Sequence, residues 1–208
     1  MISTKETRWI IHLSCGLLAM GTSELLKSCS SGAISVPTEQ VGVAKHHSGM
    51  LRGMGVVNML LERDEVNPDK QNNNRQTPLY VAAQNGHEGV VKMLLERDEV
   101  NPNEPDKGHR IPLYAAAQNG HEGVVKMLLE RDEVNPDKPN SDGQTALYVA
   151  AGNGHDGVVK MLLKRDEVNP DKPKNFGQTP LYVAAWNGHE GVVKMLLERD
   201  EVNPQKHH

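Results

Sequence analysis

Histidines that recur at a fixed spacing are the first candidates for chemistry in this sequence. His87, His121, His155 and His189 stand 34 residues apart, each within the string N-G-H followed by an acid and a glycine. Such histidines could bind zinc only if their nitrogens met about 2 Å from one ion. One histidine in each unit cannot converge in this way, because helices packed side by side lie roughly 10 Å apart. We therefore predict a structural role for these histidines and no metal site.

Carboxylates are the second candidates. Each unit carries the string R-D-E-V-N-P, which places two acids side by side, for example Asp98 and Glu99. A pair of carboxylates acts as general acid and base where a cleft shifts a pKa. These pairs instead follow a predicted helix and precede a loop, where solvated acids are the ordinary outcome. The sequence also lacks a phosphate-binding loop and a dinucleotide-binding glycine pattern. We predict that the chain is not an enzyme and uses no cofactor.

The composition argues against two further classes of partner. The 208 residues carry a formal net charge of -4, so the chain has no basic excess for nucleic acid or a membrane surface. Aromatic residues make up only 3% of the chain, so the core must be built from Val, Leu, Met and Ala. We expect neither a nucleic-acid nor a membrane partner.

The elements that position these residues come from an internal repeat. Leu79, Leu113, Leu147 and Leu181 are also spaced by 34 residues, and a fixed period of this size is typical of a solenoid. The predicted array runs from residue 54 to residue 208. Its boundaries are a half-unit at 54–74 and full units at 75–108, 109–142, 143–176 and 177–208.

Each full unit predicts a pair of short helices. In the first unit Thr77 is a suitable N-cap, Pro78 suits the first helical position and Gly86 can end the helix. Its apolar stripe is Leu79, Ala82 and Ala83. Neither helix of a unit is long enough to be stable alone, so the units must stack.

The second helix starts near Glu88 and must stop before Asn101-Pro102. Glu88 stands four residues before Lys92, an order that favours an ion pair. A polar hairpin-like loop follows, with Asp142-Gly143 as a turn signal in one copy. The apolar stripe of this helix is Val90, Val91, Leu94 and Leu95.

The block TPLYVAAQNGHEGVVKMLLE resembles the ankyrin repeat, with its T-P-L-H-x-A start, its A-A-x-x-G-H turn and its V-x-x-L-L helix. The resemblance covers residues 54–208 and implies an all-α solenoid of stacked helix–turn–helix units with hairpin-like loops. The chain departs from the family in two ways, and this variant is similar to fungal ankyrin arrays. R-D-E-V-N-P replaces the usual Gly-Ala-Asp. The family's signature His, which hydrogen-bonds neighbouring units, is replaced by Tyr80, Tyr114, Tyr148 and Tyr182.

The copies differ mainly at two places. One is the residue after the Ala pair, and the other is the loop tip, at residues 72–75, 106–109, 140–143 and 174–177. In ankyrin proteins these two sets line one concave surface, which implies binding of an unidentified protein partner. Variation at solvent-facing positions that nothing selects is the alternative. The partner-binding residues predicted in and beside these sets are Trp186, Phe176, Gln84, Gln118, Gly152, Arg110, Lys174 and Asp142.

Trp186 and Phe176 are the predicted anchors of this surface, because aromatic residues are enriched at binding hot spots. The rival reading is a structural spacer, or a fragment of a longer array or of a receptor whose effector domain is absent. Leu196 and Leu197 repeat the interior pattern where a terminal unit should be polar, which predicts end-to-end self-association through an uncapped last unit.

Residues 1–53 lack the repeat and predict an irregular or weakly helical leader. Cys15 and Cys29 lie there and form no disulfide or metal pattern, so we expect a reduced, cytoplasmic setting. The alternative is secretion, if residues 1–21 act as a weak signal peptide, since Lys5 and Arg8 precede an apolar stretch.

Overall fold

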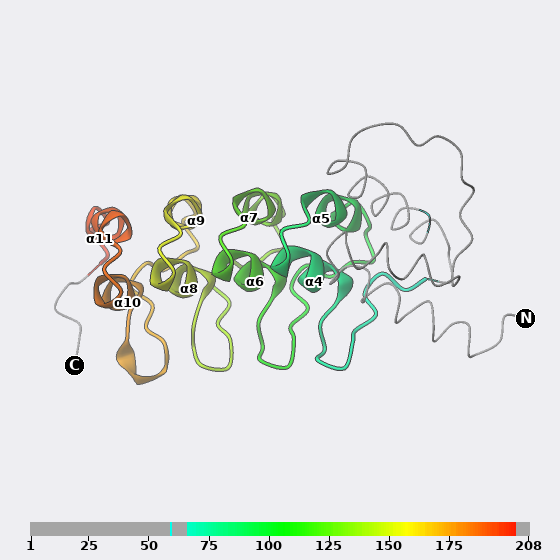
Figure 1. The fold of residues 1–208 in the computed structure, drawn as a ribbon, viewed down its shortest axis with the longest axis horizontal. Helices are drawn as coiled ribbons and strands as arrows, with labels where there is room; N and C mark the ends of the chain where they lie inside the picture. Colours follow the sequence, from blue (N-terminus) through cyan, green and yellow to red (C-terminus); the bar gives the residue numbers. More distant parts are fainter. Residues whose placement is uncertain (1–58, 60–65, 203–208) are drawn as a thin grey trace, which may run out of the picture.

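The structure is a computed structural model that describes Met59 and residues 66–202. The predicted leader, both cysteines and the first part of the half-unit lie outside the described residues. Within residues 66–202 the regular elements are helices, and no strand is present there. With the labels of Figure 1 these are α4 (Pro78–Gln84), α5 (Glu88–Leu95), α6 (Pro112–Gln118), α7 (Glu122–Leu129), α8 (Ala146–Gly152), α9 (Asp156–Leu162), the 3₁₀ turn η1 (Asn175–Gly177), α10 (Pro180–Trp186) and α11 (Glu190–Leu197).

The helices form two parallel rows. Helices α4, α6, α8 and α10 make an inner row, and α5, α7, α9 and α11 lie above them (Figure 1). Each helix packs against its partner in the unit and against the equivalent helix of the next unit. The loops that join the units project below the inner row as a series of parallel fingers. This arrangement confirms the predicted all-α solenoid of stacked helix–turn–helix units.

The helix ends follow from local sequence. The Thr77 side chain accepts a hydrogen bond from the Tyr80 N–H at 3.1 Å, and Thr145 and Thr179 cap their helices in the same way. Ile111 stands at this position in the second unit and provides no side-chain cap. Gly86 adopts a φ of +70° just after α4, where a left-handed residue closes a helix with little strain. The Thr77, Pro78 and Gly86 predictions are therefore confirmed.

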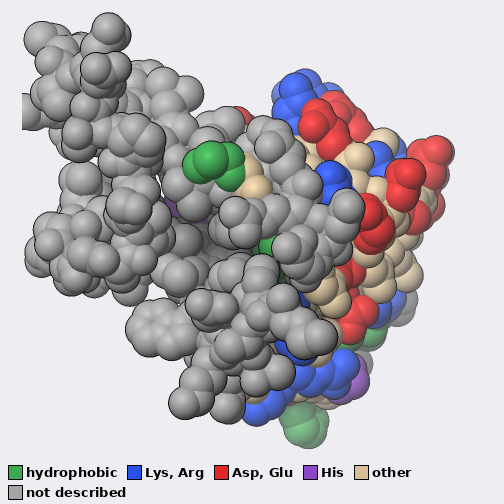
Figure 2. Space-filling model, turned by 90° about the vertical axis from the view of Figure 1, so that its right-hand side faces the viewer, with side chains coloured by type: hydrophobic (Ala, Val, Ile, Leu, Met, Phe, Trp, Pro, Cys, Tyr) green, Lys and Arg blue, Asp and Glu red, His purple; other side chains and the backbone are tan. Residues whose placement is uncertain are grey.

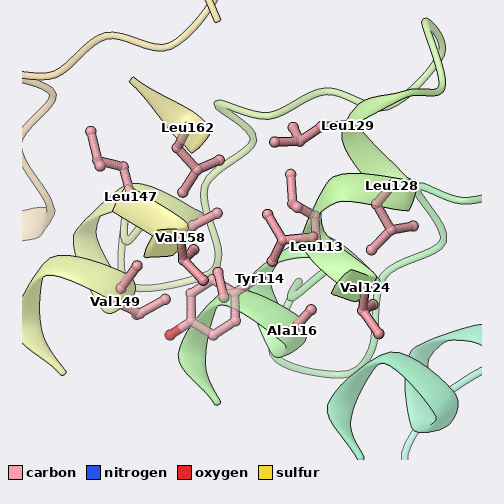
Figure 3. Close-up of a cluster of buried hydrophobic side chains, with 14 of the residues drawn as sticks. Leu113, Tyr114, Ala116, Val124, Leu128, Leu129, Leu147, Val149, Val158 and Leu162 are labelled. Carbon is pink, nitrogen blue, oxygen red and sulfur yellow. The ribbon is translucent and has the colours of Figure 1, made fainter. Parts of the chain in front are cut away.

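The apolar stripes are buried between units rather than within one. Figure 3 shows side chains of α6, α7, α8 and α9 pointing toward one another, so the second and third units share one cluster. Leu113, Leu128 and Leu147 are fully buried in it. Each apolar stripe packs partly against the other helix of its own unit and partly against the next unit. A single unit therefore cannot bury all of its apolar surface.

Three of the turn histidines, His121, His155 and His189, connect their units to the unit before. The His121 Nε2 atom lies 3.0 Å from the Gln84 carbonyl oxygen, and a Cβ on Gly86 would lie only 2.7 Å from Nδ1 of the same ring. His155 and His189 repeat both contacts one and two units further on. The glycine is thus needed for its backbone conformation and for the space that the imidazole fills. These histidines have a structural role.

The acid at the start of each second helix contacts the next unit. Glu88 does not form the predicted ion pair with Lys92 among the described residues. Its carboxylate lies instead where a Cβ on Gly123 would stand, at the beginning of α7. The pairs Glu122 with Gly157 and Asp156 with Gly191 repeat this contact. A carboxylate is favoured at this end of a helix because the helix dipole is positive there.

The last described unit has one stripe that is only partly covered. Leu196 is as completely buried as Leu128, because it faces the preceding unit. Leu197 faces the other way and is 52% exposed, whereas the equivalent Leu129 is 7% exposed. The sequence-based expectation treated Leu196 and Leu197 alike, and the structure shows that only Leu197 lacks a neighbour among the described residues.

Truncating these leucines tests the shared burial. We expect Leu129→Ala to lower the free energy of unfolding by about 2–4 kcal/mol, because it leaves a cavity between α7 and α9. Leu197→Ala should cost less than about 1 kcal/mol, because half of its side chain already contacts solvent. Urea unfolding followed by circular dichroism measures both values. Equal costs would mean that a further unit or a second copy covers α11 in solution.

Candidate functional site

The variable residues lie along two edges of the inner row. Gln84, Gln118, Gly152 and Trp186 are the last residues of α4, α6, α8 and α10, and the variable tips are the ends of the projecting loops (Figure 1). The carbonyl oxygens of Gln84, Gln118 and Gly152 accept the histidine contacts described above. Their backbone is therefore held in place, while the Gln84 side chain is partly exposed and that of Gln118 is exposed.

The four loop tips are joined to one another. The N–H groups of Lys107, Ser141 and Asn175 each donate to a carbonyl oxygen of the preceding tip, at 3.0 Å in all three cases. The acceptors are Asn74, Gly108 and Asp142. This ladder fixes the tips relative to each other, so their side chains form one continuous row rather than four independent loops.

Tyrosines supply the link between units that the signature histidine makes in the family. The Tyr114 hydroxyl donates to Oε1 of Gln144 in the next loop at 2.9 Å, and it accepts from the Asn140 side chain at 3.3 Å. Burial raises the pKa of Tyr114 to about 12, so it remains a neutral donor over the physiological range. Burial, and then the neighbouring Asp106, also raise the pKa of Tyr80 well above its ordinary value.

Arg110 is held inside its own loop. Its guanidinium Nε donates to Oδ2 of Asp106 at 2.9 Å, and a second guanidinium nitrogen binds the same oxygen. Asp106 is only 2% exposed. In the first and third loops the same two positions hold amide pairs, Asn72 with Gln76 and Asn140 with Gln144. Arg110, predicted as a partner contact, thus belongs first to an ion pair that replaces those amides.

The ion pair controls the charge of the buried acid. Burial alone would raise the pKa of the Asp106 carboxyl, but hydrogen bonds from Arg110 and from the Gly108 N–H outweigh it. The pKa of Asp106 therefore lies below its ordinary value of 3.8. A carboxyl with a lowered pKa stabilises the fold above its unfolded-state pKa, and this contribution is lost as the pH falls through the folded-state value.

Asp142 lies in the third tip and Lys174 in the fourth. The Lys174 ammonium stands 5.5 Å from the centre of the Tyr148 ring, which is the geometry of a cation–π contact. Asp142 is exposed, and its carbonyl oxygen accepts from the Asn175 N–H. Lys174 thus packs on the preceding unit, whereas the Asp142 carboxylate faces solvent.

The two predicted anchors are the most exposed large apolar side chains of the loops and inner helices. Trp186 is 77% exposed and stacks on Tyr182 of its own helix, with ring centroids 6.1 Å apart. Phe176 is 97% exposed, at the tip of the loop that contains η1. Stacking holds the indole in one orientation, and most of its surface is still available.

Two further tip residues have unusual backbone geometry that the sequence-based prediction missed. Arg75 and His109 have φ values of 61° and 59°. Gly143 and Gly177 occupy the same position in the next two units and are also left-handed. The signal was present in the repeat, where this position holds a large side chain in the first two units and glycine in the next two.

Other types of site find no support in the described part of the chain. Residues 66–202 contain no group of three or more His, Cys, Asp or Glu residues that could hold a metal ion. None of the described helices is long and apolar enough to cross a membrane. The described residues form a row of hydrogen-bonded loop tips beside a row of helix ends.

Stacked helix pairs joined by projecting loops define the protein as a helical repeat protein. The family model described as ankyrin repeats (3 copies) matches residues 48–140 and 132–206. The chain therefore belongs to the ankyrin-repeat family, whose repeats are generally protein–protein interaction modules and are typically non-catalytic. A search of the curated proteins found no match.

Exchanging the ion pair for the amide pair of the neighbouring loops tests its role. Asp106→Asn alone should lower the free energy of unfolding by about 1–3 kcal/mol, because it leaves Arg110 without its acceptor. The double variant Asp106→Asn with Arg110→Gln should recover most of this loss, because the other loops are built this way. Denaturant unfolding at pH 7 measures both effects.

Acid provides the control for this prediction. As the pH falls from the unfolded-state pKa of about 3.8 through the lower folded-state pKa of Asp106, the wild-type carboxyl becomes protonated, so the stability of the wild type should fall toward that of Asp106→Asn. A double variant that is no more stable than Asp106→Asn would contradict the equivalence of the two pairs.

Proposed function

We propose that this chain is a non-catalytic scaffold that binds a protein partner through the loop tips and the ends of the inner helices. The observation that carries the proposal is the exposure of Trp186 and Phe176, at 77% and 97%. The whole sequence contains two Trp residues and one Phe, so an exposed aromatic is an exceptional use of a rare residue here. Both stand at positions where the other units carry small or polar residues.

The physical properties of this surface suit protein recognition. Aromatic side chains bury a large area while few rotatable bonds are fixed, and binding energy is usually concentrated in a few such residues. The hydrogen-bonded tips also reduce the conformational entropy that binding would cost, because they are ordered beforehand. We further propose that the partner meets the scaffold in the cytoplasm, as the lack of a disulfide pattern in the number and spacing of the two cysteines favours.

The spacer is the second candidate, and one observation favours it. A Cβ on Gly86, Gly120 or Gly154 would meet the histidine of the next unit, whereas no atom of residues 66–202 lies within 4 Å at Gly188. Together with the partly exposed Leu197, Gly188 offers the same face that the upstream units use for stacking. End-to-end association of repeats at this face would make the chain part of a longer assembly.

Replacing Trp186 separates binding from structure. We expect Trp186→Ala to weaken binding to a partner by about 2 kcal/mol or more, which is roughly thirtyfold in affinity. The melting temperature should change little, because most of the indole faces solvent. A partner is first captured on the wild-type protein from cell extract, and its affinity for each variant is then measured by titration calorimetry.

Lys126→Ala is the matched control, since Lys126 is exposed on α7, in the row away from the loops. It should leave both affinity and melting temperature unchanged. A lower melting temperature with unchanged affinity for Trp186→Ala would show that the stack on Tyr182 is structural. If the wild-type protein retains no partner, the spacer becomes the better account.

A further inference from the structure

Three exposed side chains of the loop tips stand in a backbone conformation that normally requires glycine. Arg75, His109 and Phe176 have φ values of 61°, 59° and 71°. Every other left-handed residue in the described part of the chain is a glycine. All three side chains are exposed, and Phe176 is almost completely so.

The repeat itself shows that the fold does not need these side chains. Gly143 and Gly177 occupy the position of Arg75 and His109 and are also left-handed, whereas the residues at the position of Phe176 in the other units, Asn74, Gly108 and Asp142, are not left-handed. A left-handed conformation costs a non-glycine residue roughly 1–2 kcal/mol. Packing cannot offset this cost, because these side chains lie in solvent. Strain that the fold does not need is characteristic of residues kept for function.

The charges of the tips point to the chemistry of the partner. Arg75 and Lys107 are exposed, Lys174 is partly exposed, and none of the three pairs with a carboxylate among the described residues. Asp142 is the only exposed acid in the tips as defined above, since Asp106 is buried and paired.

At the opposite edge of the molecule the arginines are paired with glutamates, and the charges left unpaired in the described R-D-E strings are those of aspartates. Four arginines after the second helices each pair with the glutamate two residues later, namely Arg97 with Glu99, Arg131 with Glu133, Arg165 with Glu167 and Arg199 with Glu201. Asp98, Asp132, Asp166 and Asp200 lie exposed between them. On the face visible in Figure 2, Lys, Arg and His side chains gather at the lower end, and Asp and Glu side chains, mixed with some Lys and Arg, spread over the upper and right-hand parts. The chain thus leaves unpaired cations on the loop side despite its net negative charge.

We infer that Arg75, His109 and Phe176 are partner contacts and that the partner presents an acidic segment with an apolar side chain. The Arg75 guanidinium, the Lys107 ammonium and an N–H of His109 bind carboxylates over the first two tips. Phe176 and Trp186 take the apolar side chain beside the last unit. This inference rests on the proposed function and adds to it the chemical class of the partner and three contact residues in the first two tips.

Selection from a display library of random short peptides tests the inference without a known partner. The intact 208-residue protein is one target, and the triple variant Arg75→Gly, His109→Gly, Phe176→Gly is the other. We expect the peptides enriched on the wild type to be net acidic and to contain an aromatic or large aliphatic residue. Their affinity should fall about tenfold or more on the triple variant and should decrease with added salt.

The melting temperature of the triple variant shows whether a loss of affinity comes from a lost contact or from a folding defect. The triple variant should melt at the same temperature as the wild type or higher, because glycine relieves the strain. Lys126→Ala, exposed on α7 in the row away from the loops, is again the control and should change neither stability nor affinity.

The outcomes separate this inference from the proposed function. Enriched peptides that are neutral or basic, or that bind the triple variant equally well, would overturn the inference and leave the scaffold function standing. A triple variant that melts clearly lower would overturn it as well, because the three residues would then be structural. A library that yields no enriched peptide on the wild type would count against both.

Discussion

The contact between one unit and the next is the interaction on which the rest of this structure depends. Two helices of seven or eight residues cannot hold themselves together in water, so each unit is stable only against a neighbour. The contact has three parts. They are the shared apolar stripe, the histidine ring that packs on a glycine of the preceding unit, and the acid that packs on a glycine of the next unit. A unit inside the array must present both sides of this contact. The strings N-G-H-E-G and V-V-K-M-L-L are therefore almost the same in every copy.

Because every copy must keep this contact, the contact determines at which positions the copies can differ. The ends of the inner helices and the loop tips are the positions that the contact leaves free, and the hydrogen bonds between tips hold them in one row. Some of the changes at these positions affect only contacts within the fold. Asp106 and Arg110, for example, form an ion pair where two other loops hold a pair of amides. Others, such as Phe176 and Trp186, add surface that the fold does not use. An ankyrin scaffold that binds proteins needs this separation of constant contacts from variable surface.

The sequence predicted those features that depend on neighbouring residues in the chain. The Thr77 cap, the left-handed Gly86, and the stripes of Leu79 and Leu94 all follow from local preferences and periodicity. Features that depend on the neighbouring unit could not be predicted in this way. Glu88 contacts Gly123 rather than Lys92, and Leu197 rather than Leu196 faces away from the preceding unit, because only the stacking geometry sets these directions. The strained φ of Arg75 could be found only by aligning the units with each other.

Alanine at two equivalent glycines tests the central claim most directly. Gly120 and Gly188 have φ values of +72° and +77°, so alanine brings nearly the same backbone strain to both. They differ in what the new methyl meets, since the His155 ring lies 2.7 Å from it at Gly120 and none of the described atoms lies within 4 Å of it at Gly188. The free energy of unfolding of the two variants, measured in urea, should therefore differ, with Gly120→Ala less stable by at least about 1 kcal/mol because the histidine contact is displaced. Equal losses at the two positions would contradict the account, because the contact between units would then contribute nothing measurable to stability.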